Sequence, residues 1–397
     1  MNPEDLGFDA DRLERVADIC HWYVDEGKFP GTSVIVARRG RIAFRDTYGM
    51  ADIEAGKKIE DDTIFRIFSM TKPITSIALM QLVETGKVLL TNPVSRFIPS
   101  FRDVKVYVSG DQDTWEGEPP QREPTIHDIL THMSGLGAGF DRGPIGRIYR
   151  ANGLAFGVRR DATLAEHCDL LASLPLAFHP GTQWRYGAST DVCGRVVEVV
   201  SGMTLDRYFA EHIFEPLRME DTAFWVPPEK WDRFAQNYQR RDGALEPFPG
   251  RYDRPPKMLS GAGGLVGTID DYHRFATALV RGGELDGARI IGRKTLQYMA
   301  LNHLPGGADL AQMAAGASET ANEGVGFGLG FGVVIEPTSL GSLSSIGEYM
   351  WGGAASTAFW VDPVEEITVV FMTQLTPSAT YPIRPQLRWT VNQALVD

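Results

Sequence analysis

The segment from residue 70 to 87, "MTKPITSIALMQLVETGK", restricts the fold more than any other part of the chain. Its apolar residues leave almost no polar face when they are placed on a helix. Pro73 stands in the first turn, where a helix tolerates proline, and Gly86 stands where a helix ends. A helix that is apolar all round is buried on all sides, so we expect a central helix with Ser69 at its N-terminus.

The length of the chain predicts two lobes. At 397 residues it exceeds the roughly 250 to 300 residues at which one hydrophobic core stops growing. We therefore expect residues 1–95 and 256–397 to form a discontinuous α/β lobe and residues 96–255 to form a mainly helical lobe. The active site is expected in the cleft between the two lobes.

Patterns of apolar residues predict the elements of these lobes. Residues 11–26 have helical spacing, and "TSVIVARRGRIAFRDTYG" from residue 32 predicts a β-hairpin that turns at "RRGR". Helix starts of the T-x-x-D/E type stand at Thr125 and Thr163. Further β-rich runs, which we expect to complete the sheet begun by the hairpin, lie at residues 331–336, 343–349, 356–361 and 366–374. The predicted fold class is α/β (α+β), with an antiparallel sheet flanked by helices plus the mainly helical second lobe.

The composition excludes several classes of function. A net charge of -12 and a pI of about 5.2 would repel a phosphate backbone, so we expect no nucleic-acid partner. The longest apolar runs are far short of the ~18 residues that a membrane span needs. The three cysteines lack C-x-x-C spacing, and the acidic N-terminus lacks the basic and apolar regions of a secretory signal. We therefore expect a cytoplasmic location and no membrane partner.

Ser69 and Lys72 in "SMTK" are the first candidates for catalysis. A serine is a poor nucleophile unless a base removes its proton, and an amine does so only when it is neutral part of the time. Burial and a positive helix N-terminus both favour the neutral amine, and the i, i+3 spacing places both side chains on one face. One S-x-x-K motif is weak evidence for catalysis by itself. However, burying a lysine without a partner at the start of an apolar helix would cost folding free energy, so a functional reason for it is expected.

Tyr186 is the candidate for a third catalytic group. A phenol near two positive influences can relay protons to a leaving group. Among the twelve tyrosines, Tyr186 in "HPGTQWRYGASTDVCG" lies in a Gly-rich loop just before the apolar-periodic stretch 192–200. Taken alone, a tyrosine of this kind is more often a packing residue.

Four segments in a fixed order resemble one known family. They are "SMTK" with its buried helix, "TIHDILTHMSGLG" at 125–137, "PGTQWRYG" at 180–187 and "WGGAASTAFWVDP" at 351–363. Together they resemble the family VIII carboxylesterases, which are serine β-lactamase-like esterases related to class C β-lactamases and D-Ala-D-Ala carboxypeptidases. The resemblance covers nearly the whole chain and implies a β-lactamase-like fold.

The resemblance implies a serine carboxylesterase that hydrolyses short-chain carboxylic esters through an acyl-enzyme. Ser69 is then the acylated nucleophile, Lys72 its activating base, and Tyr186 the tyrosine that shares proton transfer with the lysine. The expected partner is a small-molecule ester, and the oligomeric state stays open. The sequence has no phosphate loop, nucleotide fingerprint or EF-hand pattern, so no cofactor is expected.

The W-G-G motif is expected to complete the substrate site. Trp351, Gly352 and Gly353 match residues that line the site on an edge strand in the family. The resemblance also implies that the backbone N–H groups of Ser69 and Ala354 form the oxyanion hole, where one donor is worth about 3 to 4 kcal/mol in the transition state.

Two departures from penicillin-recognising relatives point to the substrate. Those relatives carry K-T-G where this chain has "WGG", so the cation that holds the antibiotic's carboxylate is absent. They also carry Y-x-N, whereas Ala188 follows Tyr186 by two residues and supplies no amide. An ester with an apolar acyl chain needs neither contact. Weak β-lactam hydrolysis stays open as a side activity.

The sequence also bears on functions other than ester hydrolysis. Acyltransferases of the same superfamily carry the same motifs, so transfer to an alcohol or amine stays open. A catalytically silent scaffold is disfavoured because the Ser, Lys and Tyr positions are all filled. No serine has glycine at both flanking positions, which excludes the G-x-S-x-G elbow of α/β-hydrolases. His127 and His132 face different directions on a helix, so they are expected to be structural and no metal site is predicted.

Overall fold

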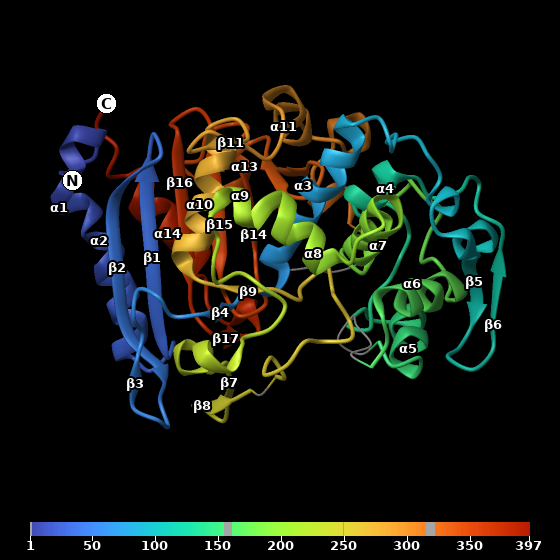
Figure 1. The fold of residues 1–397 in the computed structure, drawn as a ribbon, viewed down its shortest axis with the longest axis horizontal. Coiled ribbons are helices and arrows are strands. Elements are labelled where there is room, and N and C mark those ends of the chain that lie inside the picture. Colours follow the sequence, from blue (N-terminus) through green and yellow to red (C-terminus); the bar gives the residue numbers. More distant parts are fainter. Residues whose placement is uncertain (1, 155–160, 249, 315–321) are drawn as a thin grey trace.

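The computed structural model describes residues 2–154, 161–248, 250–314 and 322–397. Its main feature is an antiparallel sheet of eight strands in the order β12-β13-β14-β15-β16-β1-β2-β3 (Figure 1). The strands come from both ends of the chain. Their bounds are Gly31–Arg38 (β1), Arg41–Asp52 (β2), Lys57–Lys58 (β3), Val325–Phe327 (β12), Gly332–Val334 (β13), Tyr349–Gly352 (β14), Ala358–Asp362 (β15) and Ile367–Met372 (β16).

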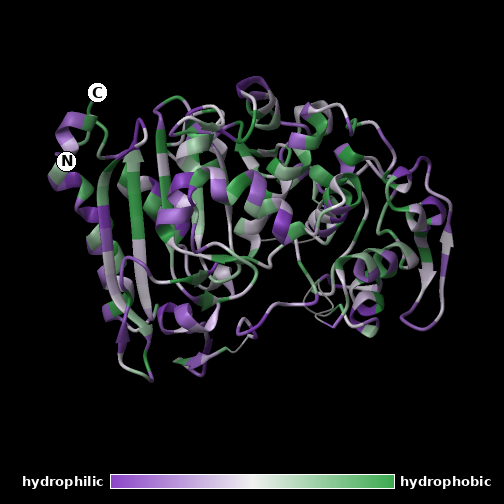
Figure 2. Ribbon diagram, viewed as in Figure 1, coloured by the Kyte–Doolittle hydropathy of each residue, from purple (hydrophilic) through white to green (hydrophobic). Residues whose placement is uncertain are grey.

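The pairing of the two chain ends confirms the predicted sheet. Strand β1 runs antiparallel to β2 on one side and to β16 on the other, with Ser33 opposite Met372 and Arg38 opposite Ile367. All residues of β1 are buried, and Figure 2 shows hydrophobic colour over the upper part of the strand. A strand buried on both faces requires a layer of helices on each side of the sheet.

Helices cover both faces of the sheet. Helix α10 (Ile269–Val280), which begins at the N-cap Thr268, packs on β15 and β16. Helices α2 (Arg15–Asp25) and α14 (Ile383–Asn392) lie on the opposite face. Successive side chains of a strand point to opposite faces, so alternate residues of β16 enter different cores. The sheet therefore forms the middle layer between two hydrophobic cores.

Helix α3 runs from Thr71 to Glu84, as the sequence predicts, and nearly all of it is buried. Gly86 follows the helix with a φ of 73°, the left-handed conformation that ends helices. Helix α3 packs against α7 (Ser189–Ser201) and α8 (Leu205–Phe209), and Figure 1 shows it between the strands and α7. The central position places the beginning of α3 beside the sheet.

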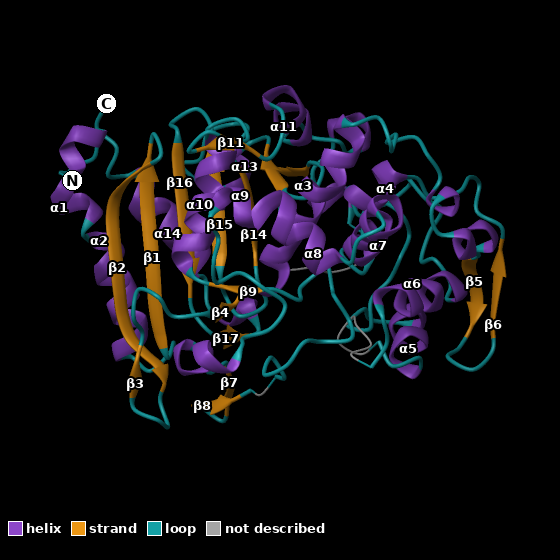
Figure 3. Ribbon diagram, in the orientation of Figure 1, coloured by secondary structure: helices purple, strands orange, loops and turns teal. Residues whose placement is uncertain are grey.

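The middle of the chain is rich in helices (Figure 3). Thr125 and Thr163 each form a capping box, so the predicted helix starts are confirmed. The helices of this part that are not yet named are α4 (Ile126–Leu130), α5 (Pro144–Ala151), α6 (Leu164–Ser173) and α9 (Glu215–Leu217). It also contains two hairpins, β5 (Val106–Gly110) with β6 (Trp115–Glu118) and β7 (Tyr238–Arg241) with β8 (Ala244–Pro247). Strand β7 pairs in parallel with β17 (Leu375–Thr376) from the C-terminal part, so the two predicted lobes share a small sheet. The boundaries of the two lobes stay a prediction.

The other helices and strands of the described residues are short. The remaining helices are α1 (Ala10–Leu13), α11 (Arg293–Met299), α12 (Leu310–Met313) and α13 (Pro337–Leu340). The remaining strands are β4 (Phe65–Arg66), β9 (Val266–Gly267), β10 (Glu284–Leu285) and β11 (Ala288–Arg289). Over the described ranges, every helix is too short or too polar to cross a lipid bilayer.

Two sequence predictions in the C-terminal region were wrong. The strand expected at 343–349 is a loop, because Gly347 has a φ of 92° and Ile346 is 66% exposed, and β14 begins only at Tyr349. The W-G-G motif is also not on an edge strand, since β14 lies between β13 and β15. Strand β13 pairs only as far as Met350, so the end of β14 is hydrogen-bonded on one side alone.

Candidate active site

Ser69 lies in a strained turn between a short strand and the central helix. It is the middle residue of a 3-10 turn, Phe68–Met70, which follows β4 and leads into α3. Phe68 has a φ of 43°, a left-handed conformation that is uncommon for a residue other than glycine. Such strain persists only where the surrounding structure enforces it, and it is concentrated at functional sites. The turn therefore holds the half-buried Ser69 in a fixed position at the start of the helix.

Lys72 reaches Ser69 from the first turn of α3. Its Nζ lies 3.3 Å from Ser69 Oγ and donates a 2.7 Å hydrogen bond to the carbonyl oxygen of Ala262. Only 4% of Lys72 is exposed. A backbone acceptor thus holds the amine beside the serine hydroxyl, and the amine is shielded from water. This position suits a base that takes the proton of Ser69.

Tyr186 approaches the same oxygen from the segment before α7. Its hydroxyl donates a 2.6 Å hydrogen bond to Ser69 Oγ. Lys72 Nζ lies 4.5 Å from the centroid of the Tyr186 ring, within the range of a cation–π interaction. The structure therefore brings the three predicted catalytic side chains together around one oxygen. A proton that leaves Ser69 can pass to this pair and return from it to a leaving group.

Aromatic side chains surround Tyr186. The ring centroids of His132, Trp351 and Phe140 lie 5.2, 5.4 and 6.2 Å from that of Tyr186. Burial, together with the charge of Lys72, holds the pKa of His132 well below its usual range, so the imidazole is neutral. Phe140 is 58% exposed, which extends this apolar lining to the surface. Such a lining suits the apolar part of a small molecule.

A buried carboxylate holds the loop that receives Lys72. Asp191 lies in the first turn of α7 and is 1% exposed. One of its oxygens accepts hydrogen bonds from the Ser260 hydroxyl at 2.7 Å and from the Ala262 N–H at 3.0 Å. His167 Nε2 lies 3.6 Å from the other oxygen. Asp191 thereby fixes the loop whose Ala262 carbonyl binds the lysine amine.

The W-G-G segment passes beside the turn that carries Ser69. Trp351 and Gly352 end strand β14, and Gly353 follows. A Cβ atom at Gly353 would lie 2.4 Å from the carbonyl oxygen of Ile67, so only glycine permits this close approach. Ala354 comes next in the turn, and its N–H donates to no protein acceptor among the residues that the structure describes. Its place in an oxyanion hole stays a prediction.

Sequence reasoning missed several residues of this site. Ala262 contributes a backbone carbonyl, for which no side chain gives a signal, and nothing in the sequence linked Phe140 to Tyr186. His132 was expected to be structural, and it packs against Tyr186. His127 lies instead 3.1 Å from His303, measured from Nε2 to Nδ1, and burial lowers the pKa of both. In the described parts of the chain, no group of three or more potential metal ligands occurs.

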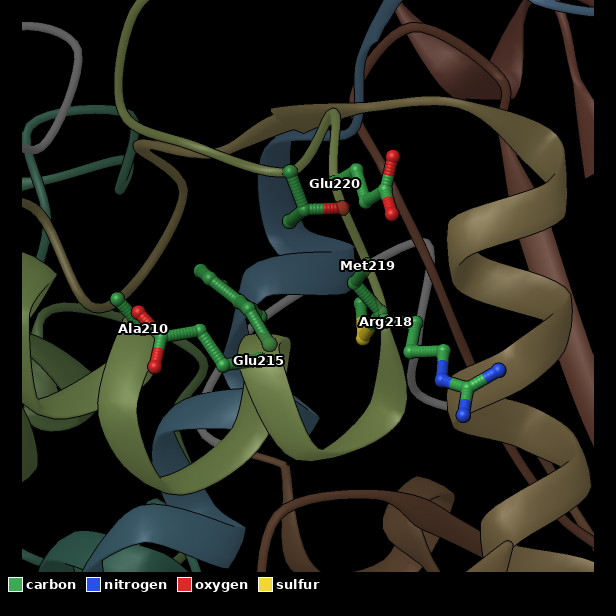
Figure 4. Close-up of a pocket in the computed structure, with 7 residues that line it drawn as sticks. Ala210, Glu215, Arg218, Met219 and Glu220 are labelled. Carbon is green, nitrogen blue, oxygen red and sulfur yellow. The ribbon is translucent and has the colours of Figure 1, made fainter. Parts of the chain in front are cut away.

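A hollow of about 400 Å³ lies away from these groups (Figure 4). It is formed by the segment around α9, and none of the residues around Ser69 contributes to it. Its lining consists of Ala210, Phe214, Glu215, Arg218, Met219, Glu220 and Thr222. It is therefore separate from the candidate active site.

The chain is similar to known proteins over most of its length. Esterase EstB of Burkholderia gladioli is 33% identical over 394 residues, which cover 94% of this chain and 93% of EstB. Acyltransferase calJ of Penicillium decumbens is 28% identical over 335 residues, which cover 80% of this chain and 77% of calJ. The solved structure of EstCE1, a hydrolase with promiscuous acyltransferase activity, has a TM-score of 0.84 at 26% identity and covers 96% of this chain and 99% of its own. Because the Beta-lactamase family model matches residues 16–393, this chain belongs to the beta-lactamase family.

Proposed function

We propose that this protein is a serine carboxylesterase that hydrolyses short-chain carboxylic esters of small molecules through an acyl-enzyme on Ser69. One observation carries the proposal: Lys72 Nζ and the Tyr186 hydroxyl lie 3.3 and 2.6 Å from Ser69 Oγ. A serine becomes a nucleophile when an adjacent base takes its proton, and this arrangement supplies two neighbouring groups for that transfer. The esterase and hydrolase names of EstB and EstCE1 support the same reaction class.

The reaction has two balanced steps. Ser69 Oγ attacks the ester carbonyl carbon while its proton passes to the Lys72–Tyr186 pair, and the N–H groups of Ser69 and Ala354 stabilise the oxyanion. The carbon–oxygen bond to the alcohol then breaks, and the alcohol leaves with the proton from the pair. Water attacks the acyl-enzyme by the same route, the acid leaves, and the Ser69 hydroxyl is restored.

The lining of the site supports an apolar acyl group. Trp351 occupies the motif position at which penicillin-recognising relatives carry a cation, and its ring lies 5.4 Å from Tyr186 and 5.4 Å from Phe327. The Trp351 side chain itself supplies no positive charge for a substrate carboxylate. Uncharged esters with short acyl chains fit this lining better than β-lactam antibiotics do.

Acyl transfer to an alcohol is the second candidate function. It uses the same acyl-enzyme, with an alcohol in place of water in the second step. The names of calJ and EstCE1 favour it as an additional or alternative activity.

We also propose a reducing location such as the cytoplasm, a proposal supported by three free, buried cysteines.

The test is intact-protein mass spectrometry of the wild type and Ser69→Ala after brief exposure to p-nitrophenyl butyrate. Release of p-nitrophenol is followed in parallel, with and without an added alcohol. We expect a transient butyryl adduct on the wild type alone and no turnover by Ser69→Ala. Circular dichroism of both proteins checks that the variant is folded.

Each outcome separates the candidates. Release that the alcohol leaves unchanged supports hydrolysis, whereas faster release with butyryl transferred to the alcohol supports the acyltransferase. Substantial turnover by pure Ser69→Ala would refute both candidates, because each requires the acyl-enzyme.

A further inference from the structure

An arginine on the C-terminal helix holds a peptide bond of the active site. Arg384 of α14 donates hydrogen bonds through Nη2 to the carbonyl oxygens of Gly353, at 2.8 Å, and Thr357, at 2.9 Å. We propose that Arg384 orients and polarises the Gly353–Ala354 peptide, so that the Ala354 N–H is a fixed and strengthened donor to the oxyanion. The inference rests on the proposed function, because it concerns the same acyl-transfer site.

One peptide unit connects the arginine to the predicted donor. The Gly353 carbonyl and the Ala354 N–H belong to the same planar peptide and point in opposite directions in its trans form. The Gly353 oxygen also accepts a 3.1 Å hydrogen bond from the N–H of Ser356. Both lone pairs of this oxygen are therefore occupied, and the peptide cannot rotate without breaking both bonds. This fixes the Ala354 N–H on the side of the peptide that faces away from Arg384.

The charge of the arginine strengthens the donor at the other end of the peptide. A charge-assisted hydrogen bond draws electron density toward the carbonyl oxygen, which leaves the N–H of the same peptide more positive. Arginine is always protonated in proteins, so this polarisation does not depend on pH. Arg384 acts through the peptide without touching the substrate and is thus a positioning residue.

The glycines of the W-G-G motif make this arrangement possible. A Cβ atom at Gly352 would lie 2.5 Å from Arg384 Nη2 and 2.9 Å from the Thr357 carbonyl oxygen. Any side chain at residue 352 would therefore push the guanidinium away from its acceptors. The first glycine admits the arginine, and the second, Gly353, admits the Ile67 carbonyl that precedes the Ser69 turn.

The test compares Arg384→Gln and Arg384→Lys with the wild type. Activity on p-nitrophenyl butyrate is normalised to the active sites that react with a fluorophosphonate, so that unfolded protein is not counted. Complete loss of one oxyanion donor lowers kcat by about 10²- to 10³-fold, and here the donor is weakened but retained. We therefore expect Arg384→Gln to lower kcat roughly 5- to 50-fold with KM almost unchanged, and Arg384→Lys to recover part of the loss.

The inhibition constant of phenylboronic acid is a second readout, which would not change if Arg384 only supported the fold. The tetrahedral adduct of this acid on Ser69 places an oxygen where the oxyanion forms, so its inhibition constant should rise by the same factor as kcat/KM falls. Gly352→Ala is a second variant, which displaces the guanidinium while it keeps the arginine. We expect this variant to show the same fall in kcat and the same weaker boronate binding.

Arg388→Gln is the matched control. Arg388 lies one turn further along α14 and donates a 2.9 Å hydrogen bond to the buried Glu348. Replacing Arg388 should lower the Tm and leave the kcat of each active site unchanged. An equal fall in kcat in Arg388→Gln would assign the effect to the packing of α14 and overturn the inference.

The outcomes distinguish this inference from the proposed function. If the wild type forms no acyl adduct on Ser69, the proposed function fails and the inference fails with it. If the wild type forms the adduct while Arg384→Gln keeps wild-type kcat and boronate affinity, the inference alone is wrong.

Discussion

Replacing Asp191 with alanine tests how the catalytic base is held. The carboxylate accepts hydrogen bonds from the Ser260 hydroxyl and the Ala262 N–H, at 2.7 and 3.0 Å, and only 1% of Asp191 is exposed. Alanine leaves both donors without an acceptor, and each such loss costs about 1 to 3 kcal/mol. The Ala262 N–H is only partly buried, so we expect the free energy of unfolding to fall by about 2 to 5 kcal/mol.

The same substitution should lower activity more than stability accounts for. The loop that Asp191 holds also carries the Ala262 carbonyl, which accepts a 2.7 Å hydrogen bond from Lys72 Nζ. A shift of this loop moves the amine relative to Ser69, and a misplacement of ~1 Å costs up to ~10²-fold in rate. We expect kcat/KM for each folded molecule of Asp191→Ala to fall roughly 10- to 100-fold.

Two measurements and one control variant test whether Asp191 positions Lys72. Denaturant unfolding gives the loss of stability, and p-nitrophenol release well below the unfolding midpoint gives kcat/KM. Ser260→Ala removes one donor to Asp191 and keeps the bond to Ala262, so it should cost about 1 kcal/mol and leave kcat/KM within about threefold of the wild type. Wild-type kcat/KM in folded Asp191→Ala would refute the argument that this carboxylate positions Lys72.

Three further predictions concern single residues. Tyr186→Phe should lower kcat by at least ~10²-fold with little change in KM, and unchanged steady-state kinetics would make the tyrosine a packing residue. Burial raises the pKa of Asp271 to about 6, above its value of 3.8 in the unfolded chain, so the native state binds the proton more tightly and Asp271 reduces stability as pH rises from about 4 to 6. One oxygen of the Asp271 carboxyl group accepts both hydrogen bonds made to that group, and the carbonyl oxygen of an asparagine can accept them too. Asp271→Asn should therefore raise the free energy of unfolding by up to ~3 kcal/mol at about pH 8 and by almost nothing at about pH 4. A variant that is less stable than the wild type at pH 8 would contradict this. Gly353→Ala would place a Cβ atom 2.4 Å from the Ile67 oxygen, so we expect the variant to fold by circular dichroism but to lose most of its esterase rate, and full activity would show that the close approach is dispensable.

Local chemistry explains what the sequence could predict. The central helix is a continuous apolar stretch between a proline and a glycine, so its existence and its ends depend on neighbouring residues alone. Ser69 and Lys72 are one turn apart, and a single helical turn fixes their relative position. Tyr186 required tertiary structure, and only the order of family motifs connected it to the serine. The helix and the sheet pairing are confirmed, and Tyr186 lies 2.6 Å from Ser69 Oγ, while its catalytic role stays a prediction.

What the sequence could not predict depends on backbone groups and distant packing. Ala262 acts through a carbonyl oxygen that any residue would supply. Arg384 binds two backbone carbonyls, and its partners are invisible in a sequence where arginine is common. The loop at 343–348 has an apolar pattern like that of a strand, but Ile346 is 66% exposed and pairs with no strand in the described part of the chain. Strand prediction there failed because burial, and not the apolar pattern, decides pairing.

The pairing of β1 with β16 also sets the order in which this protein can fold during synthesis. Ser33 and Met372 are opposite each other, so the N-terminal hairpin leaves the ribosome long before its partner strand exists. Until then the edge of β1 offers unpaired backbone groups and apolar side chains to other chains. Contacts this distant in sequence make folding slow and prone to aggregation. We expect the nascent chain to depend on chaperones, and Ser69 to gain the neighbouring W-G-G segment only after residues 351–353 have been synthesised.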